Sequence, residues 1–565
     1  MATNGHFDLT TETLLPEPRS VAFTGEVRSV ESDIGLSVSV EDERVKRAAL
    51  DWRSSLQPAP EEHRGSGGLP ACDARAGDEL TVAVDRSVVA HPQGYRLLVD
   101  PERIGIIGGA PAGCFYALMT LRQLTDCTAG RLPVCRIEDQ PDFETRGFLH
   151  DVTRGKVPTL DTLTMIADRL ARFKINQFQL NIEHAFVFSF DPTICGPNEG
   201  LTPDEVHALD EYCQDRFIDL VPALATFGHM GRILSMPKYR HLAEVSPERD
   251  WAAQTWQERA RGLTLDCTVP EAHRLVERMW GDVLDAFSSP VVNICGDEPH
   301  DLGKGGSAGR YTPAQIGEAY VNQLRRTQDI CAARGRTTQV WSDVITNYPH
   351  LIDRLAPETA VLHWGYDDAA DYDGTAKFVA TGLATHVCPG TCGWKRVLNA
   401  MDLAERNIST FAAAGRRSGA RGLITADWGD HGHFNLLACS WHGMALGAAC
   451  GWRADHPIGA AFDKRFVRTM FGIDDARLVS CLRAASRIAE KGETWTWLRT
   501  PAEELAGRDD LPTLEQIEAT RRAAEEGGKR IAEIAAGMTS SKWPLAKRLR
   551  RVSGRRAFFP VSSLK

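Results

Sequence analysis

Residues 146–182 read RGFLHDVTRGKVPTLDTLTMIADRLARFKINQFQLNI, which predicts a strand, a helix and a second strand. The two ends, RGFLHDV and INQFQLNI, are short runs rich in apolar or β-branched residues, as strands are. Between them, TLDTLTMIADRLARF spaces its apolar residues as one face of a helix requires. A strand–helix–strand unit of this kind is typical of α/β folds built on a parallel sheet.

The same pattern continues through residues 141–455. Six further strand-like runs follow, each ended by a turn signal: DLVPALATF, VVNICGD, TTQVWSD, TAVLHWG, LATHVCP and GLITADW. With the first two they make eight, and polar or aromatic residues stand at nearly every carboxyl end. Eight such units predict a (β/α)8 TIM barrel, with a doubly wound open sheet as the alternative.

Two further regions flank the predicted barrel. Within residues 1–140, the segment GYRLLVDPERIGIIGGAPAGCFYALMTLRQL predicts two strands and a helix, so we expect a small N-terminal α/β domain. Residues 456–565 predict a mostly helical C-terminal region. It ends in a basic tail with seven Lys or Arg between Lys542 and Arg556, which we interpret as solvated rather than as a nucleic-acid or membrane contact.

Composition narrows the classes of function. The 565 residues carry 65 Lys and Arg against 75 Asp and Glu, and a net charge of −10 gives no support for nucleic-acid binding. No apolar run is long enough to predict a membrane span, and the N-terminus lacks the parts of a secretory signal. The 14 cysteines include no C-x-x-C pair, so we expect free buried thiols and a cytoplasmic protein.

The carboxyl ends of the strands are where a TIM barrel places its catalytic groups, and the fourth predicted strand ends in Asp297 and Glu298. Adjacent carboxylates repel each other, which raises the pKa of one and suits a general acid. Successive residues of a strand face opposite ways, so the two can share a pocket only if the chain bends. Gly296 and Pro299 make such a bend feasible.

Three tryptophans stand at the ends of the fifth, sixth and eighth predicted strands: Trp341, Trp364 and Trp428. Aromatic walls suit the apolar face of a sugar ring and can pack an acetamido methyl group. One tryptophan alone is more often core packing, but three at one barrel mouth indicate a carbohydrate pocket.

A metal-dependent barrel hydrolase is a second interpretation, because Asp297, His300, His431 and His433 offer oxygen and nitrogen ligands for zinc. In zinc-dependent barrel hydrolases such as the amidohydrolases, however, the H-x-H lies on the first strand, whereas the H-x-H of DHGH follows the eighth strand. We therefore expect no metal and no cofactor. Cys295 lies inside a strand and is interpreted as a buried thiol rather than a nucleophile.

These residues resemble the bacterial branch of the family 20 glycoside hydrolases, the β-N-acetylhexosaminidases. RGFLHDVTR is similar to the family's R-G-x-x-x-D-x-x-R, FGHM to its P-G-H, and NICGDEP to its G-D-E core. Residues 94–124 resemble the small α/β domain that precedes the barrel, and TADWGDHGHF and CPGTCGW resemble the bacterial branch. The resemblance covers most of the chain and implies exo-hydrolysis of terminal β-linked N-acetylglucosamine or N-acetylgalactosamine.

The family implies a retaining mechanism in which the substrate's own acetamido oxygen attacks the anomeric carbon and forms an oxazolinium. Glu298 would be the acid and then the base, and Asp297 would orient the acetamido N–H. His229 would contact Glu298, and Glu183 would contact His229. By position, the substrate-binding residues would be Arg146, Trp341, Trp364, Trp428 and Asp430.

The seventh predicted strand departs from the family, because CPGTCGW replaces the usual Y-x-D. Tyr366 is a candidate stand-in for the missing tyrosine, and Trp394 is added to the expected substrate-binding residues. The change leaves the choice between gluco and galacto sugars open, with a non-catalytic glycan-binding relative as an alternative. The expected partner is a small-molecule or oligosaccharide substrate that ends in N-acetylhexosamine. A homodimer is compatible with the helical C-terminal segment.

Overall fold

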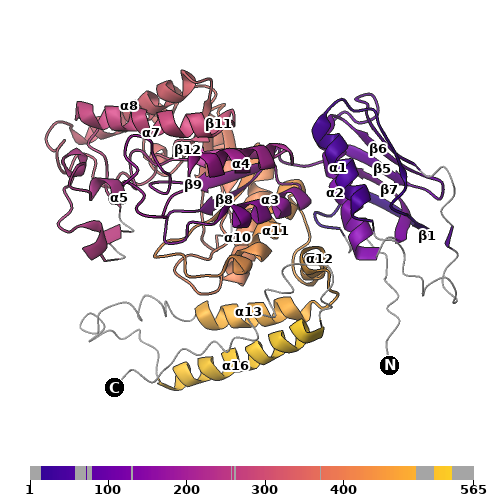
Figure 1. Cartoon of the computed structure of the whole chain (residues 1–565). Coiled ribbons are helices and arrows are strands. Elements are labelled where there is room, and N and C mark those ends of the chain that lie inside the picture. The colour runs from indigo at the N-terminus through magenta and orange to yellow at the C-terminus, as the bar shows by residue number, and fades with distance from the viewer. Residues whose placement is uncertain are drawn as a thin grey trace.

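The computed structural model describes residues 14–56, 71–72, 79–128, 131–255, 258–259, 262–369, 371–490 and 514–537 (Figure 1). The basic tail between Lys542 and Arg556 lies outside these ranges, so its interpretation as a solvated terminus stays a prediction.

Eight parallel strands close into a barrel, which confirms the predicted TIM barrel and excludes the open sheet. Around the barrel the order is β10-β11-β12-β13-β14-β15-β8-β9, and each strand coincides with one of the eight predicted runs. The strands are β8 (Thr145–Asp151), β9 (Gln177–Asn181), β10 (Asp219–Ala223), β11 (Val291–Asn293), β12 (Thr337–Trp341), β13 (Ala360–Trp364), β14 (Ala384–Cys388) and β15 (Gly422–Asp427).

Helices cover the outside of the barrel, and their ends carry the expected sequence signals. Thr202 and Glu205 form a capping box before the first turn of α4, with Pro203 at its first position. Gly419 ends α10 in the left-handed conformation that glycine tolerates. The longer helices are α3 (Leu160–Arg172), α4 (Pro203–Gln214), α7 (Pro270–Ala286), α8 (Pro313–Ala332), α10 (Met401–Ser418) and α11 (Leu437–Trp452); α5 (Gly231–Leu234) and α9 (Gly374–Val379) are short.

A separate sheet precedes the barrel, and α2 lies between this sheet and the barrel (Figure 1). The expected strand–turn–strand–helix is present as β5, β6 and α2. The sheet order is β2-β4-β6-β5-β7-β1-β3. Its elements are β1 (Ser20–Ser29), β2 (Gly35–Val38), α1 (Glu43–Ser54), β3 (Ala71–Cys72), β4 (Glu79–Val84), β5 (Tyr95–Val99), β6 (Arg103–Gly108), α2 (Pro111–Thr128) and β7 (Arg131–Asp139).

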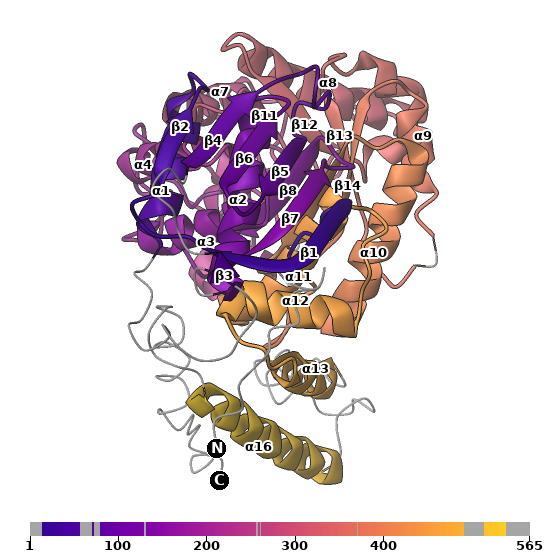
Figure 2. The same ribbon diagram turned by 90° about the vertical axis from the view of Figure 1, so that its right-hand side faces the viewer.

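In the part of the chain that the structure describes, three helices follow the barrel, as expected: α12 (Ala460–Phe471), α13 (Arg477–Glu490) and α16 (Leu514–Gly537). Helices α13 and α16 run side by side (Figures 1 and 2), and Arg483 of α13 pairs with Asp402 and Glu405 of α10. Within the described ranges, no helix is both long and apolar enough to cross a membrane. The cysteines whose side chains are described are all free and mostly buried, as predicted.

Candidate active site

The acid pair Asp297–Glu298 lies just beyond the end of β11, where the chain leaves the pleated strand. Strand β11 stops at Asn293, and the following backbone adopts positive φ at Cys295 (57°), Gly296 (86°) and Glu298 (47°). The bend brings both carboxylates to one partner: Asp297 Oδ2 and Glu298 Oε2 each lie 3.3 Å from His229 Nε2. The expected departure from the pleat is therefore present, and the two acidic side chains face the same imidazole.

His229 carries the proton of this group in the free protein. Burial alone would lower the pKa of His229, but the carboxylates of Asp297 and Glu298 raise it well above its ordinary value. The hydrogen bond from His229 in turn lowers the pKa of Glu298, against the opposing effect of burial. The imidazolium thus sits between two carboxylates, and Glu298 is ionised until a ligand changes its surroundings.

A third carboxyl group, Asp343, has the raised pKa that we expected within the acid pair. Burial, followed by the charge of Asp297, raises the pKa of Asp343 to about 7. Asp343 Oδ2 accepts a hydrogen bond of 3.1 Å from the backbone N–H of Glu298, and so it holds the left-handed turn at that residue. The raised pKa that repulsion was expected to give one member of the pair is not found at Glu298, because the hydrogen bond with His229 lowers its pKa.

Arg154 contacts three other carboxylates at the mouth, a role that we did not predict from the sequence. Its guanidinium lies 2.8 Å from Asp151 and from Glu183 and 3.4 Å from Asp430. Glu183 and His229, expected to be in contact, line the same cavity and interact through their charges, and Arg154 donates a hydrogen bond to Glu183. The signal for Arg154 was its position, three residues past the carboxyl end of β8.

An aromatic cluster lines the barrel mouth beside the acid pair. Trp364 stacks on Tyr366 with ring centroids 5.2 Å apart, and Trp341 lies 5.8 Å from Trp428. The Tyr366 hydroxyl accepts a hydrogen bond of 2.6 Å from Trp428 Nε1, and Trp394 packs edge-on against Tyr366 at 4.9 Å. The structure therefore brings together all five aromatic residues predicted for the pocket.

Arg146 does not lie at the mouth, which corrects its expected role in binding sugar hydroxyls. It is the second residue of β8, at the amino end of the strand, and it is fully buried. Its guanidinium donates to the backbone carbonyls of Lys174 and Phe143 and to the side chain of Gln93, and it lies over the ring of Trp452. Arg146 thus fastens the barrel floor to the sheet domain.

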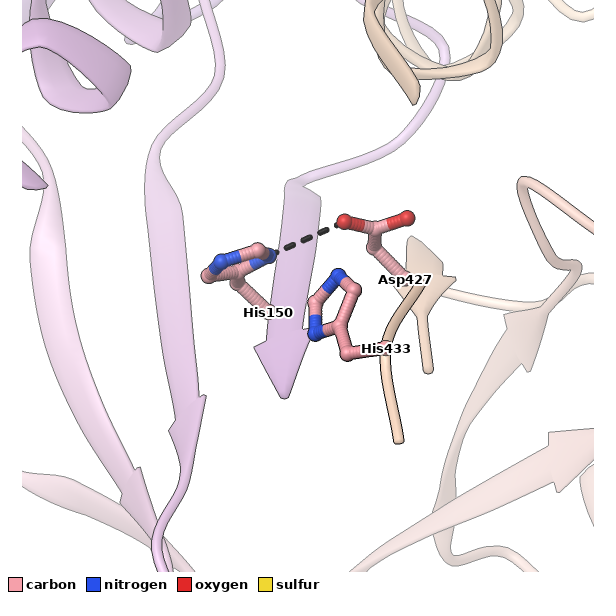
Figure 3. Close-up of side chains that lie close together, drawn as sticks. All are labelled: His150, Asp427 and His433. Carbon is pink, nitrogen blue, oxygen red and sulfur yellow. Dashed lines mark hydrogen bonds and ion pairs between the residues drawn. The ribbon is translucent and has the colours of Figure 1, made fainter. Parts of the chain in front are cut away.

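The four ligands of the metal-hydrolase hypothesis do not converge. His300 is half-exposed and lies 3.7 Å from Glu298, whereas His433 is buried elsewhere, against His150 and Asp427 (Figure 3). Among the described residues, Asp297, His300, His431 and His433 form no group close enough to hold one ion.

A cavity of about 520 Å³ opens beside Arg154, Glu183 and His229. Three nitrogen-bearing side chains extend its wall: Arg232, Arg259 and His431. Trp251 adds an aromatic surface opposite His184. A concave space with convergent polar groups and an aromatic face is the usual form of a small-ligand site.

Comparisons with known proteins agree with this architecture. The profile of glycosyl hydrolase family 20 domain 2 matches residues 11–140, and that of the family's catalytic domain matches residues 195–392. Curated relatives include a β-hexosaminidase of Porphyromonas gingivalis, 24% identical over 329 residues, and one of Akkermansia muciniphila, 27% identical over 277 residues. These alignments cover 52% and 44% of this chain but only 40% and 55% of the relatives.

A solved structure of the N-acetyl-β-hexosaminidase of Streptomyces plicatus, in complex with Thio-NAglucal, has the same fold. It superposes with a TM-score of 0.62 over 81% of this chain and 94% of its own, at 20% identity. The order of sheet domain and barrel thus matches the two family profiles, which together span more than half of the 565 residues. The chain belongs to glycosyl hydrolase family 20.

Proposed function

We propose that this protein is an exo-acting β-N-acetylhexosaminidase that works by a retaining, substrate-assisted mechanism. The observation that carries the proposal is the meeting of Asp297 and Glu298 on one imidazole, His229, at a barrel mouth where five aromatic side chains cluster. The names of the similar proteins support the same class of substrate, although the chain spans about half the length of the curated relatives described above.

In the first step, the carbonyl oxygen of the substrate's 2-acetamido group attacks its own anomeric carbon. The bond to the leaving oxygen breaks as Glu298 protonates that oxygen, and an oxazolinium forms on the sugar. The proton reaches Glu298 along its 3.3 Å contact with His229, which holds it in the free protein. In the second step Glu298 removes a proton from water, which opens the oxazolinium with net retention.

Asp297 supports the ring that closes. Its carboxylate accepts the acetamido N–H and stabilises the positive charge that develops on the oxazolinium. Because the nucleophile is part of the substrate, its effective concentration is high and no covalent bond to the protein is needed.

Tyr366 takes the place of the tyrosine that strand β14 lacks. Its oxygen already accepts a hydrogen bond from Trp428, so its own O–H is the remaining donor and can reach the acetamido oxygen. The faces of Trp341, Trp364 and Trp428 surround the methyl group.

Arg154 and Asp430, rather than Arg146, bind the hydroxyls at the far end of the sugar. Arg154 is nearly enclosed, and its guanidinium is fixed by Asp151 and Glu183. A sugar hydroxyl that reaches this group meets a charged donor whose orientation is already set, which favours specific binding.

The test is a panel of aryl β-glycosides with and without the 2-acetamido group. We expect turnover only with the acetamido sugars, and inhibition by a thiazoline that mimics the oxazolinium. Equal rates on the deoxy or hydroxy sugars would refute the mechanism. Tight thiazoline binding without turnover would instead support the glycan-binding alternative. The cytoplasmic location and a homodimer stay predictions, which fractionation and sedimentation would test.

A further inference from the structure

His150, Asp427 and His433 form a buried cluster (Figure 3). Strands β8 and β15 pair Asp427 directly with His150. The neighbouring residues Leu149 and Ala426 pack inside the barrel, so strand alternation turns Asp427 and His150 outward. His433 comes from the loop after β15, and its ring points toward the other two side chains (Figure 3).

The spacing of the three side chains suits one metal ion. One ligand atom from each residue lies within 4.8 Å of the other two, and His150 Nδ1 is 2.9 Å from Asp427 Oδ2. Zinc bound to imidazole nitrogen and carboxylate oxygen at about 2.0–2.2 Å separates its ligand atoms by roughly 3.3 Å. Small side-chain shifts therefore suffice to close the site.

Asp427 is a buried carboxylate held by contacts from several elements. Asp427 has no exposed surface, and among the described residues its only ion-pair partner is the imidazole of His150. Its other oxygen accepts hydrogen bonds from the hydroxyls of Thr391 and Ser440, which orient the carboxylate but carry no charge. An ion bound here would add a full positive charge beside a carboxylate that has no exposed surface.

His433 supplies an independent observation. Only 2% of its surface is exposed, and its buried Nδ1 has no hydrogen-bond partner among the described residues. A buried ring nitrogen without a partner costs free energy unless a ligand atom or an ion satisfies it. Its ring packs edge-on against His150 at 5.3 Å, inside the cluster rather than toward solvent.

We propose that His150, Asp427 and His433 bind one divalent transition-metal ion of the zinc class, which ties β8, β15 and the loop after β15 together. Two imidazoles and a carboxylate are a common ligand set for such ions. The ion lies on the outer face of the wall, so it organises the loop that carries Asp430 and takes no part in the hydrolysis. The proposal is independent of the proposed function.

The second group of candidate ligands in the described residues, Glu405, His442 and Asp463, provides a matched control. There the guanidinium of Arg483 already pairs with Glu405 and Asp463, so the cation position is filled by the protein. We expect this cluster to bind no metal.

The experiment uses tag-free full-length protein, stripped with a chelator and then titrated with Co²⁺ and Zn²⁺. We expect one equivalent of Co²⁺ with a visible d–d spectrum, displacement by Zn²⁺, and a Tm that rises with metal concentration. His433→Gln should weaken Zn²⁺ binding at least about 100-fold, and His442→Gln should not change it. Uptake below a tenth of an equivalent, or equal binding by wild type and His433→Gln, would overturn the proposal.

X-ray absorption of the zinc-loaded wild type needs no variant to fold. A first shell of two imidazoles and oxygen supports the site, and a shell with sulfur or without imidazole refutes it. Metal uptake without glycosidase turnover would refute only the proposed function, whereas turnover without metal uptake would refute only the metal site.

Discussion

Asp343 gives a stability prediction whose sign and size follow from its environment. Burial and the charge of Asp297 raise its pKa from 3.8 to about 7, so the native state holds a proton that the unfolded chain releases. The stabilisation from this proton is fully present below pH 3.8 and is lost as the pH rises through 7. The perturbation that reveals it is Asp343→Asn, which imitates the protonated carboxyl at every pH.

The magnitude comes from the two pKa values. Between pH 5 and pH 8 the wild type loses about 2–3 kcal/mol through this one group, whereas the asparagine variant does not. The amide oxygen of the variant can still accept the hydrogen bond from the Glu298 N–H, so the turn at Glu298 is kept. From pH 5 to pH 8, the free energy of unfolding of the variant should therefore rise by about 2–3 kcal/mol relative to that of wild type.

Urea unfolding of both proteins at pH 5 and pH 8 measures this difference. Asp329→Asn is the matched control, because it makes the same chemical change on an exposed side chain of α8. Its free energy relative to wild type should stay constant between the two pH values. If Asp343→Asn also gives a constant difference, the assignment of a native-state proton to Asp343 is refuted.

Three further predictions concern the barrel mouth and floor. Arg146→Met should lower the free energy of unfolding by about 2–4 kcal/mol, because buried carbonyls lose a charged donor, and it should leave KM unchanged. Arg154→Met should lower kcat/KM at least about 100-fold, because the proposed charged donor to the sugar hydroxyls is removed. Glu298→Gln should reduce turnover about 10²–10⁴-fold for substrates with poor leaving groups and much less for those that release nitrophenol. Asp297→Asn should slow both kinds of substrate. If Glu298→Gln slowed both kinds equally, the role of Glu298 as the acid would be contradicted. Tyr366→Phe should cost about tenfold in kcat/KM for acetamido substrates, and a loss that is the same for a substrate without the carbonyl would count against the proposed hydrogen bond.

The strands and the bend at the acid pair could be predicted because they depend on local sequence. Each barrel strand is a short apolar run ended by a turn, and such runs keep their identity whatever packs around them. The departure from the pleat followed from Gly296 and Pro299 beside two carboxylates that must face one way. The aromatic pocket followed from one rule, that residues at the carboxyl ends of barrel strands meet at one mouth.

Two errors had physical causes. Arg146 was placed in the pocket from its motif alone, yet five residues of strand at about 3.3 Å each separate it from Asp151 by roughly 16 Å. The distance along the strand, had it been applied, would have favoured Arg154. The raised pKa of Asp343 could not be predicted, because it depends on burial and on Asp297, which only the tertiary structure supplies.

The end of β15 links the sugar pocket to the proposed metal site. Ala426 packs inside the barrel, Asp427 faces outward and Trp428 reaches the aromatic cluster, so neighbouring residues serve opposite faces of one wall. The following loop has positive φ at His431, Gly432 and His433, and at a non-glycine residue this conformation costs about 1–3 kcal/mol. A loop with this backbone conformation is stable only where contacts with neighbouring groups offset that cost. On the outer face the holding group would be the ion on His433, so stripping the metal should raise KM more than it lowers kcat.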